Sequence, residues 1–262
     1  MQMLSPDLLD RRALALIELT DYAGKPVAAP AELSGNGMRF FAKGGGRYAL
    51  LEAAGFESYT ASFASAPALA AKTLPFAIRI ANPVHMSRLA EIRLPRTADP
   101  ADRGKPESLF QPLRIMIHPA TAAPIPATAA AVRVTVVHKT NKKLVGGALV
   151  RVKSANGKFA ATGLTDVTGE ALVIVPAFPI SFTTGGATVE DSLAATVTAV
   201  ADPANVLLTD PADLATILQA GSLPSPIDPD KLASQFAAPP GGTAIRLSTR
   251  RVESVKIEWN PP

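Results

Sequence analysis

The stretch GLTDVTGEALVIVP, residues 163–176, is the part of this chain that decides its fold class. In it a short polar turn, Asp166–Gly169, precedes an aliphatic run of strand length. An aspartate at the start of such a turn can accept hydrogen bonds from the following backbone amides. A glycine three residues later tolerates the left-handed conformation that closes the bend. The stretch therefore predicts a β-strand that starts in register directly after a tight turn.

A similar pattern occurs near the N-terminus and indicates an approximate internal repeat. Residues 16–33 correspond to residues 133–150, and the first of these segments carries the turn Asp21–Gly24. Farther along, 46–51 corresponds to 169–174, each a glycine followed by a strand-like run. A repeat of this kind predicts two related modules that arose by duplication.

The composition favours strands over helices. Hydrophobic residues make up 47% of the 262 residues but aromatics only 5%, so much of the apolar content is alanine and valine, and 24 prolines and 18 glycines divide it into short runs. Such punctuation is typical of all-β proteins. The chain has no cysteine, which excludes disulfides and thiolate metal sites and is consistent with folding in a reducing cytoplasm.

Candidate strands recur at short intervals along both halves, as expected for a β-sandwich. In the run from Phe76 to Ile80 the alternation places Phe76, Ile78 and Ile80 on one face. The candidates in the first half are 13–19, 38–42, 47–52, 58–64, 76–81, 89–94 and 109–118. Those in the second half are 132–136, 144–153, 158–162, 171–175, 194–200, 244–248 and 252–259.

We predict an N-terminal β-sandwich module over residues 1–118, an extended Ala/Pro-rich linker over 119–131 and a C-terminal β-sandwich over 132–262. A short helical insertion is expected near 210–236, because Asp210 and Pro211 supply an N-cap and a first helical residue. Three apolar residues of this insertion are candidate contact residues: Leu214, Ile217 and Leu218.

The second half resembles the carboxypeptidase regulatory-like, or transthyretin-like, β-sandwich family. That resemblance covers about a third of the module and implies an immunoglobulin-like sandwich, while it leaves activity open because the family supplies spacer, adhesion and assembly domains. The matching residues are Leu144, Gly147, Ala148, Val150, Val152, Thr165, Asp166, Gly169, Leu172, Val173, Val175 and Pro176.

A broader pattern is similar to accessory structural proteins of phage-tail-like contractile injection systems. The motifs Leu94–Arg96 and Leu109–Pro112 carry this resemblance, together with the order of the segments around them. It implies a non-enzymatic subunit that binds other protein subunits, or copies of itself, in a particle assembled in the cytoplasm.

Residues that could carry catalysis or metal binding are scattered. His85, His118 and His138 stand on different predicted elements without a second ligand at metal-binding spacing, so solvated or capping roles are expected. The glycine clusters 35–37 and 44–46 predict hairpin turns, since no Lys-Ser/Thr pair follows them. Asp202, Asp210 and Asp228, each followed by proline, predict turns or helix caps rather than a calcium site. The sequence therefore predicts neither an enzyme nor a cofactor.

Charge and hydropathy exclude two further classes of partner. The net charge of +4 is spread along the chain, and three Tyr and one Trp offer little for base stacking, so no nucleic acid is expected. The N-terminus carries Asp7 and Asp10 before Arg11 and Arg12, and its apolar run is broken by Glu18, which predicts neither a signal peptide nor a membrane span.

Two functional hypotheses remain. The first is a structural subunit of a multiprotein particle; the alternative is a module that binds carbohydrate or another surface ligand. Trp259 is central to the choice, because it is either a core residue of the last strand or an exposed contact residue. Val255 and Ile257 share its face, which favours the core.

Overall fold

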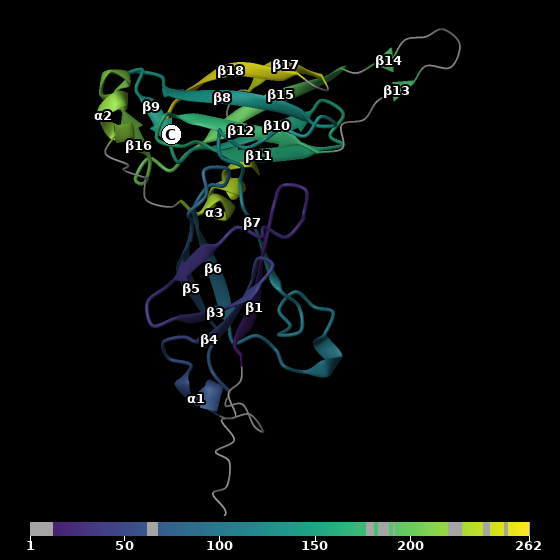
Figure 1. Ribbon diagram of the computed structural model, residues 1–262, viewed down its shortest axis with the longest axis vertical. Coiled ribbons are helices and arrows are strands. Elements are labelled where there is room, and N and C mark those ends of the chain that lie inside the picture. The colour runs from purple at the N-terminus through teal and green to yellow at the C-terminus, as the bar shows by residue number, and fades with distance from the viewer. Residues whose placement is uncertain are drawn as a thin grey trace, which may run out of the picture. The chain divides into compact units, whose positions relative to one another are not determined.

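The computed structural model describes residues 13–61, 68–176, 181–182, 189–190, 192–219, 227–237, 242–248 and 251–261. It is mainly β-structure and falls into two compact units (Figure 1). The first unit contains the chain up to Thr20, Pro26–Ile78 and Ala90–Ile115; the second contains Asp21–Lys25, Arg79–Leu89 and the chain from Met116 onward. The predicted all-β class is confirmed.

The first unit has a four-stranded sheet in the order β3-β4-β1-β7 and a three-stranded sheet in the order β2-β5-β6. Alternation along β1 and β4 buries one face of the larger sheet, where Ile17, Leu19 and Leu50 lie. The elements are β1 (Ala15–Thr20), β2 (Ala31–Ser34), β3 (Arg39–Gly44), β4 (Arg47–Glu52), α1 (Glu57–Ala61), β5 (Lys72–Ile80), β6 (Arg88–Leu94), the 3-10 helix η1 (Pro100–Asp102) and β7 (Leu113–Met116).

The second unit is a sandwich of two larger sheets. One has the order β11-β10-β15-β17; in the other, β12, β8, β9 and β16 follow one another and β18 pairs with β8 in parallel (Figure 1). The strands are β8 (Ala130–His138), β9 (Leu144–Gly146), β10 (Leu149–Ser154), β11 (Ala160–Leu164), β12 (Glu170–Val175), β13 (Ser181–Phe182), β14 (Val189–Glu190), β15 (Ser192–Val200), β16 (Leu207–Thr209), β17 (Thr243–Ser248) and β18 (Val252–Trp259).

Valine and alanine fill the space between these sheets. Inward-facing residues of β8, β10, β12 and β15 alternate with outward-facing ones, and Leu247, Ile257 and Trp259 complete this core. The small side chains explain how a chain with few aromatics still forms a closely packed interior.

The predicted helical insertion is present between β16 and β17. It comprises η2 (Pro211–Asp213), α2 (Leu214–Gln219), α3 (Pro229–Ala233) and η3 (Ser234–Ala237). Leu232 and Phe236 pack with Leu149 and Val200, so α3 and η3 cover the outer face of the β10–β15 pair. Asp210 and Asp228 cap η2 and α3 through their side chains, each with proline at the start of the helix.

The internal repeat has a structural counterpart in strand pairing. β1 pairs with β4 as β8 pairs with β12, in both cases antiparallel. The carbonyl of Gly46 accepts the Leu19 N–H at 2.9 Å, and the carbonyl of Gly169 accepts the Val136 N–H at 2.8 Å. Both glycines have positive φ, +75° and +69°. In both units a left-handed glycine therefore comes directly before the strand that pairs with β1 or β8.

These glycines also lie where no side chain fits. A Cβ on Gly46 would come within 2.4 Å of the Val27 carbonyl oxygen, and one on Gly169 within 2.9 Å of Val136 O and 3.0 Å of Val145 N. Val145 belongs to β9, which meets β8 at the pair Val137–Leu144, just beyond the end of the β12 ladder. Gly169 thus marks the point at which β8 changes partner from β12 to β9.

The division into units differs from the single predicted boundary. Residues 119–131 are part of the second unit: the Ala120 N–H donates to Val84 O at 3.0 Å, and β8 already begins at Ala130. Alanine and proline are too small to form a core of their own, but they can cover the outer face of an existing sheet. The residues packed together there are Tyr22, Ala123, Ile125, Ala129, Ala131, Leu172 and Ile174.

Three predicted strands also differ, and one of them, 109–118, is a strand only over Leu113–Met116. The segment 58–64 was expected to be extended, but Glu57–Ala61 forms the short helix α1, in which Thr60 donates a side-chain hydrogen bond to Glu57 O at 2.9 Å; residues 62–67 lie outside the described part. The single strand expected over 144–153 is divided into β9 and β10 at Gly147, whose φ is +83°. A left-handed residue interrupts the extended backbone there.

Replacing Gly169 by alanine should lower the free energy of unfolding of the second unit by about 3 kcal/mol, because the left-handed strain and the backbone clash add together. Gly157→Ala is the matched control: its φ is +70° but the space around its Cβ is open, so a loss of about 1 kcal/mol is expected. Urea unfolding followed by fluorescence of the single tryptophan, Trp259, measures both. Equal losses for the two variants would contradict the role given to Gly169.

Candidate functional site: a buried arginine and an exposed apolar face

The two Asp-x-x-Gly turns singled out in the sequence share one set of hydrogen bonds. Asp21 Oδ1 accepts the N–H groups of Ala23 and Lys25, both at 2.8 Å. Asp166 Oδ1 accepts those of Thr168 at 2.8 Å and Glu170 at 3.3 Å. Gly24 and Gly169 close the turns with positive φ. Both carboxylates are therefore engaged in holding the backbone.

Of the four proposed contact residues, the structure describes the side chains of Trp259 and Leu214. Trp259 is buried in the core of the second unit, with its ring edge-to-face on His138 at 5.7 Å between centroids, so it offers no surface to a partner. This agrees with the core interpretation and removes the carbohydrate platform that needed its ring. Leu214 at the start of α2 is half-buried, while the side chains of Ile217 and Leu218 lie outside the described part.

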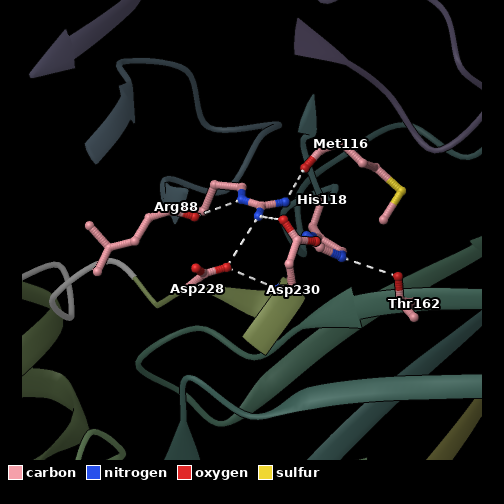
Figure 2. Close-up of polar contacts among 7 residues, drawn as sticks. Arg88, Met116, His118, Thr162, Asp228 and Asp230 are labelled. Atoms are coloured by element: carbon pink, nitrogen blue, oxygen red, sulfur yellow. Dashed lines mark hydrogen bonds and ion pairs between the residues drawn. The ribbon is translucent and has the colours of Figure 1, made fainter. Parts of the chain in front are cut away.

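The second unit contains a fully buried arginine that the sequence analysis missed. The side chain of Arg88, at the start of β6, is 1% exposed. Its Nε donates to Leu89 O at 2.9 Å and its Nη1 to Met116 O at 2.8 Å. Its Nη2 lies 3.5 Å from Asp228 Oδ1 and also contacts Asp230 Oδ2 (Figure 2). Carbonyl and carboxylate oxygens on several sides thus replace the water that this cation loses.

The two aspartates come from the first turn of α3. Asp228 is its N-cap and accepts the Asp230 N–H at 3.0 Å. Burial raises the pKa of Asp228, and the hydrogen bond from Asp230 and the charge of Arg88 oppose that rise. A backbone hydrogen bond from Leu89 N–H to Ile227 O, 2.9 Å long, lies beside the ion pair. The helical insertion is therefore fastened to residues 88–89 by charge and by backbone.

His118 lies next to this cluster and is also buried, contrary to the solvated or capping role expected for it (Figure 2). Its Nε2 is 3.1 Å from Thr162 Oγ1, while within the described part of the chain its Nδ1 has no hydrogen-bond partner. Burial, and then the charge of Arg88, lower the pKa of His118 to about 3. The ring is therefore neutral at physiological pH and packs as a core group.

The other two histidines differ from His118. His138 caps a turn, because its Nδ1 accepts the Thr140 N–H at 3.2 Å, which is one of the roles expected from the sequence. His85 is half-buried, and burial lowers its pKa. Among the residues that the structure describes, no three His, Asp or Glu side chains lie close enough together to hold a metal ion.

A second buried arginine shapes a loop of the first unit. The Arg96 guanidinium donates from Nε and Nη2 to Ser108 O, at 3.2 and 2.9 Å, and from Nη2 to Gln111 O at 3.1 Å. It also contacts Pro106 O. The loop closes through Leu109 N–H to Thr97 O at 2.8 Å. One buried cation thus fixes residues 97–111 as a compact loop that bears Leu109 and Phe110.

The first unit exposes apolar side chains near that loop. We call this surface the Phe41 face: it consists of Leu16, Glu18, Phe41, Lys43, Arg47, Ala49, Leu109, Phe110 and Arg114. Phe41 is 57% exposed and Phe110 55%. In the register of β3, β4 and β1, Phe41 stands opposite Ala49 and Ala49 opposite Leu16, which puts all three on one face of the sheet. Leu109, which precedes Phe110 in the loop, lines one groove together with Leu16 and Ala49, so the loop adjoins this face of the sheet. Exposed apolar side chains on such a surface are typical of an interaction site.

Glu18 lies in the middle of the Phe41 face and is almost fully buried. Its carboxylate pairs with Arg47 Nε at 2.9 Å and Arg114 Nε at 3.2 Å. The hydrogen bond from Arg47 lowers the pKa of Glu18, against the opposing effect of burial, and Arg114 lowers it further. The carboxylate is therefore ionised and fully occupied with two arginines.

Sequence reasoning missed Arg88, Arg96, Phe41 and Phe110 as a set. Arg96 and Phe110 do lie within the motifs that resemble injection-system proteins, so a signal for them was present. No helix in the described ranges is long and apolar enough to cross a membrane.

Comparisons with known proteins give no family. No family model matches the chain, and no curated protein matches it. Three solved structures with slight similarity are the Bacillus anthracis TIE protein (TM-score 0.27, 9% identity, covering 95% of this chain and 34% of that one), the major pilin subunit BcpA of Bacillus cereus (0.26, 12%, 97% and 61%) and the shaft pilin SpaA of Lactobacillus rhamnosus GG, as its D295N mutant (0.22, 10%, 95% and 97%). The chain thus spans about a third and about three-fifths of the first two. Likeness of this degree carries no argument about function.

Arg88→Met should destabilise the second unit by about 3 kcal/mol, because it leaves the mostly buried Asp228 carboxylate without its cation. Adding Asp228→Asn should recover much of the loss, since asparagine still caps α3. Lys142→Met is the control: its pair with Glu258 is exposed to solvent, so its loss should change stability far less than the loss of the buried Arg88. Urea unfolding followed by Trp259 fluorescence measures all three, and a double variant no more stable than Arg88→Met would contradict the ion-pair account.

His118 makes stability depend on pH. Its folded pKa of about 3 lies below the unfolded value of 6.5, so between these values the unfolded chain binds more protons and stability rises with pH. The contribution of His118 is complete above 6.5 and is lost as pH falls toward 3. His118→Gln should therefore reduce the stability difference between pH 7.5 and pH 5 by about 2 kcal/mol. An unchanged difference in urea unfolding at the two pH values would show that His118 is accessible to protons in the folded state.

Proposed function

We propose that this chain is a non-enzymatic structural subunit that contacts other proteins of a larger assembly. The observation that carries the proposal is the Phe41 face of the first unit, where Phe41 and Phe110 are each more than half exposed on a rigid sheet and loop. Monomeric proteins seldom leave such groups uncovered, while interaction surfaces are enriched in aromatic residues and arginine.

The use of the buried ionisable groups supports the same proposal. Arg88, Arg96 and Glu18 each bind partners within their own unit, and these contacts hold the insertion, a loop and a sheet in place. Groups committed in this way stiffen a scaffold. A rigid scaffold with an exposed apolar face is suited to repeated docking in an assembly.

The finer proposal rests on sequence resemblance. We infer that the assembly is a phage-tail-like contractile injection particle, formed in the cytoplasm, and that the second unit is a carboxypeptidase regulatory-like, or transthyretin-like, sandwich. The motifs Leu94–Arg96 and Leu109–Pro112 support the first inference. The turn Asp166–Gly169 and the strand after it support the second.

Sedimentation of the tagged chain from its source cells tests the assembly. The wild-type chain should travel with a large particle in a sucrose gradient but behave as a monomer when purified alone. Phe41→Ser combined with Phe110→Ser should move the chain to the top of the gradient. Val252→Ser, which removes an apolar side chain that is 43% exposed in the second unit, is the matched control and should leave it in the particle.

Mass spectrometry of the particle distinguishes the general proposal, a subunit of an assembly, from the finer one, a subunit of a contractile injection particle. Sheath, tube or baseplate proteins should be present if the finer proposal holds, and a particle without them would overturn it. A wild-type chain that never enters a particle would overturn the structural role itself.

A further inference from the structure

The Phe41 face contains a groove next to the free edge of a sheet. The groove has a volume of about 470 Å³ and is lined by Ala13, Ala15, Leu16, Lys43, Gly44, Arg47, Ala49 and Leu109. Its lining is mainly apolar but includes Lys43 and Arg47. These two cations and the apolar floor set the chemistry of what can bind there.

The strand beside the groove, β3, is open to pairing. It is the last strand in the order β3-β4-β1-β7, so within the described residues of the first unit no strand pairs with its outer edge. Five of its six residues are exposed. An exposed edge of this kind offers backbone N–H and C=O groups to an added strand.

The charge around the groove selects among partners. Lys43, Arg47 and Arg114 supply three positive charges and Glu18 one negative charge, which leaves a net charge of +2 on this face. Arg39, at the start of β3, is already paired with Glu52 at 2.6 Å. Cations along an edge repel basic strands and admit acidic ones.

Given that the chain is an assembly subunit, as proposed above, we propose that the Phe41 face binds an extended segment of a partner protein in which every second residue, along one face of the strand, is apolar and acidic by turns. The segment adds to the outer edge of β3. Every second side chain then falls on the face that bears Phe41, Lys43 and the groove. Its apolar side chains fill the groove, and its carboxylates pair with Lys43 and the two arginines.

Binding of synthetic peptides to the purified full chain tests this inference. The probe is a fluorescein-labelled dodecapeptide with three repeats of Val-Thr-Asp-Thr, which places valine and aspartate on one face of an extended strand and threonine on the other. It is compared by anisotropy with the same peptide carrying asparagine or lysine in place of aspartate. The aspartate peptide should bind at least ten-fold more tightly than the asparagine peptide, and its affinity should fall with added salt.

Charge reversal supplies the specific variant. Lys43→Glu is chosen because Lys43 is exposed and, unlike Arg47 and Arg114, forms no ion pair with the buried Glu18. It should lower the affinity for the aspartate peptide at least ten-fold and raise the affinity for the lysine peptide. Lys256→Glu, the same change at an exposed position of β18 in the second unit, is the control and should alter neither. Amide shifts confined to Arg39–Gly44 and the groove would locate the peptide on β3.

Three results would overturn the inference. These are equal binding of the aspartate and asparagine peptides, equal effects of Lys43→Glu and Lys256→Glu, and concentration-dependent dimerisation through this face, which would identify a second copy as the occupant. Failure here is distinct from failure of the proposed function. In the former case Lys43→Glu still sediments with the particle while the double phenylalanine variant does not; in the latter case the wild-type chain does not sediment either.

Discussion

Both units depend on a position at which a strand exchanges one pairing partner for another. At that position a second main-chain segment lies so close that a side chain would not fit. Gly46 and Gly169 occupy that position, each with a left-handed backbone and a carbonyl that accepts from the unit's first strand. A side chain there would meet main-chain atoms that cannot move without breaking a ladder. The constraint is on the backbone rather than on any particular contact of the core. It explains why the two units keep this feature while their surfaces and loops differ.

Buried arginines hold in place the segments that lie outside the sheets. The chain is poor in large aromatics, so segments that lie outside the sheets have little apolar area with which to hold themselves down. Arg88 and Arg96 provide directional bonds instead. Arg88 fastens α3, while Arg96 fixes the loop that bears Phe110. In the first unit this rigidity keeps Leu109 at the groove, because residues 97–111 can relax only by stripping a buried cation of its acceptors.

The parts that could be predicted from the sequence are those with a local cause. Period-two alternation in Val132–Val136 and an aspartate followed by a glycine at Asp166–Gly169 produce their structure from neighbouring residues, and so do the capped helix starts at Asp210 and Asp228. The pairing of Arg88 with Asp228 spans 140 residues and leaves no periodic trace. The exposure of Phe41 could not be predicted either. The alternation along β3 shows that its two faces differ, but it does not show which face the second sheet covers. Residues 119–131 have the composition of a linker, because small residues cannot form a core of their own, and the sheet face that they cover is not visible in the sequence.

The parallel pairing of β18 with β8 joins Val252 to Ala131 and Trp259 to His138. A chain made from its N-terminus onward exposes β8 long before β18 exists. All the strands of the first unit precede β8, so that unit can close while synthesis continues. The second unit must hold an open strand edge until more than a hundred further residues have emerged, and loop closure over that length is slow. During this interval the edge of β8 can pair with the wrong strand, either within the chain or on a neighbouring one. The order of synthesis therefore makes the second unit the one whose folding in the cell is at risk.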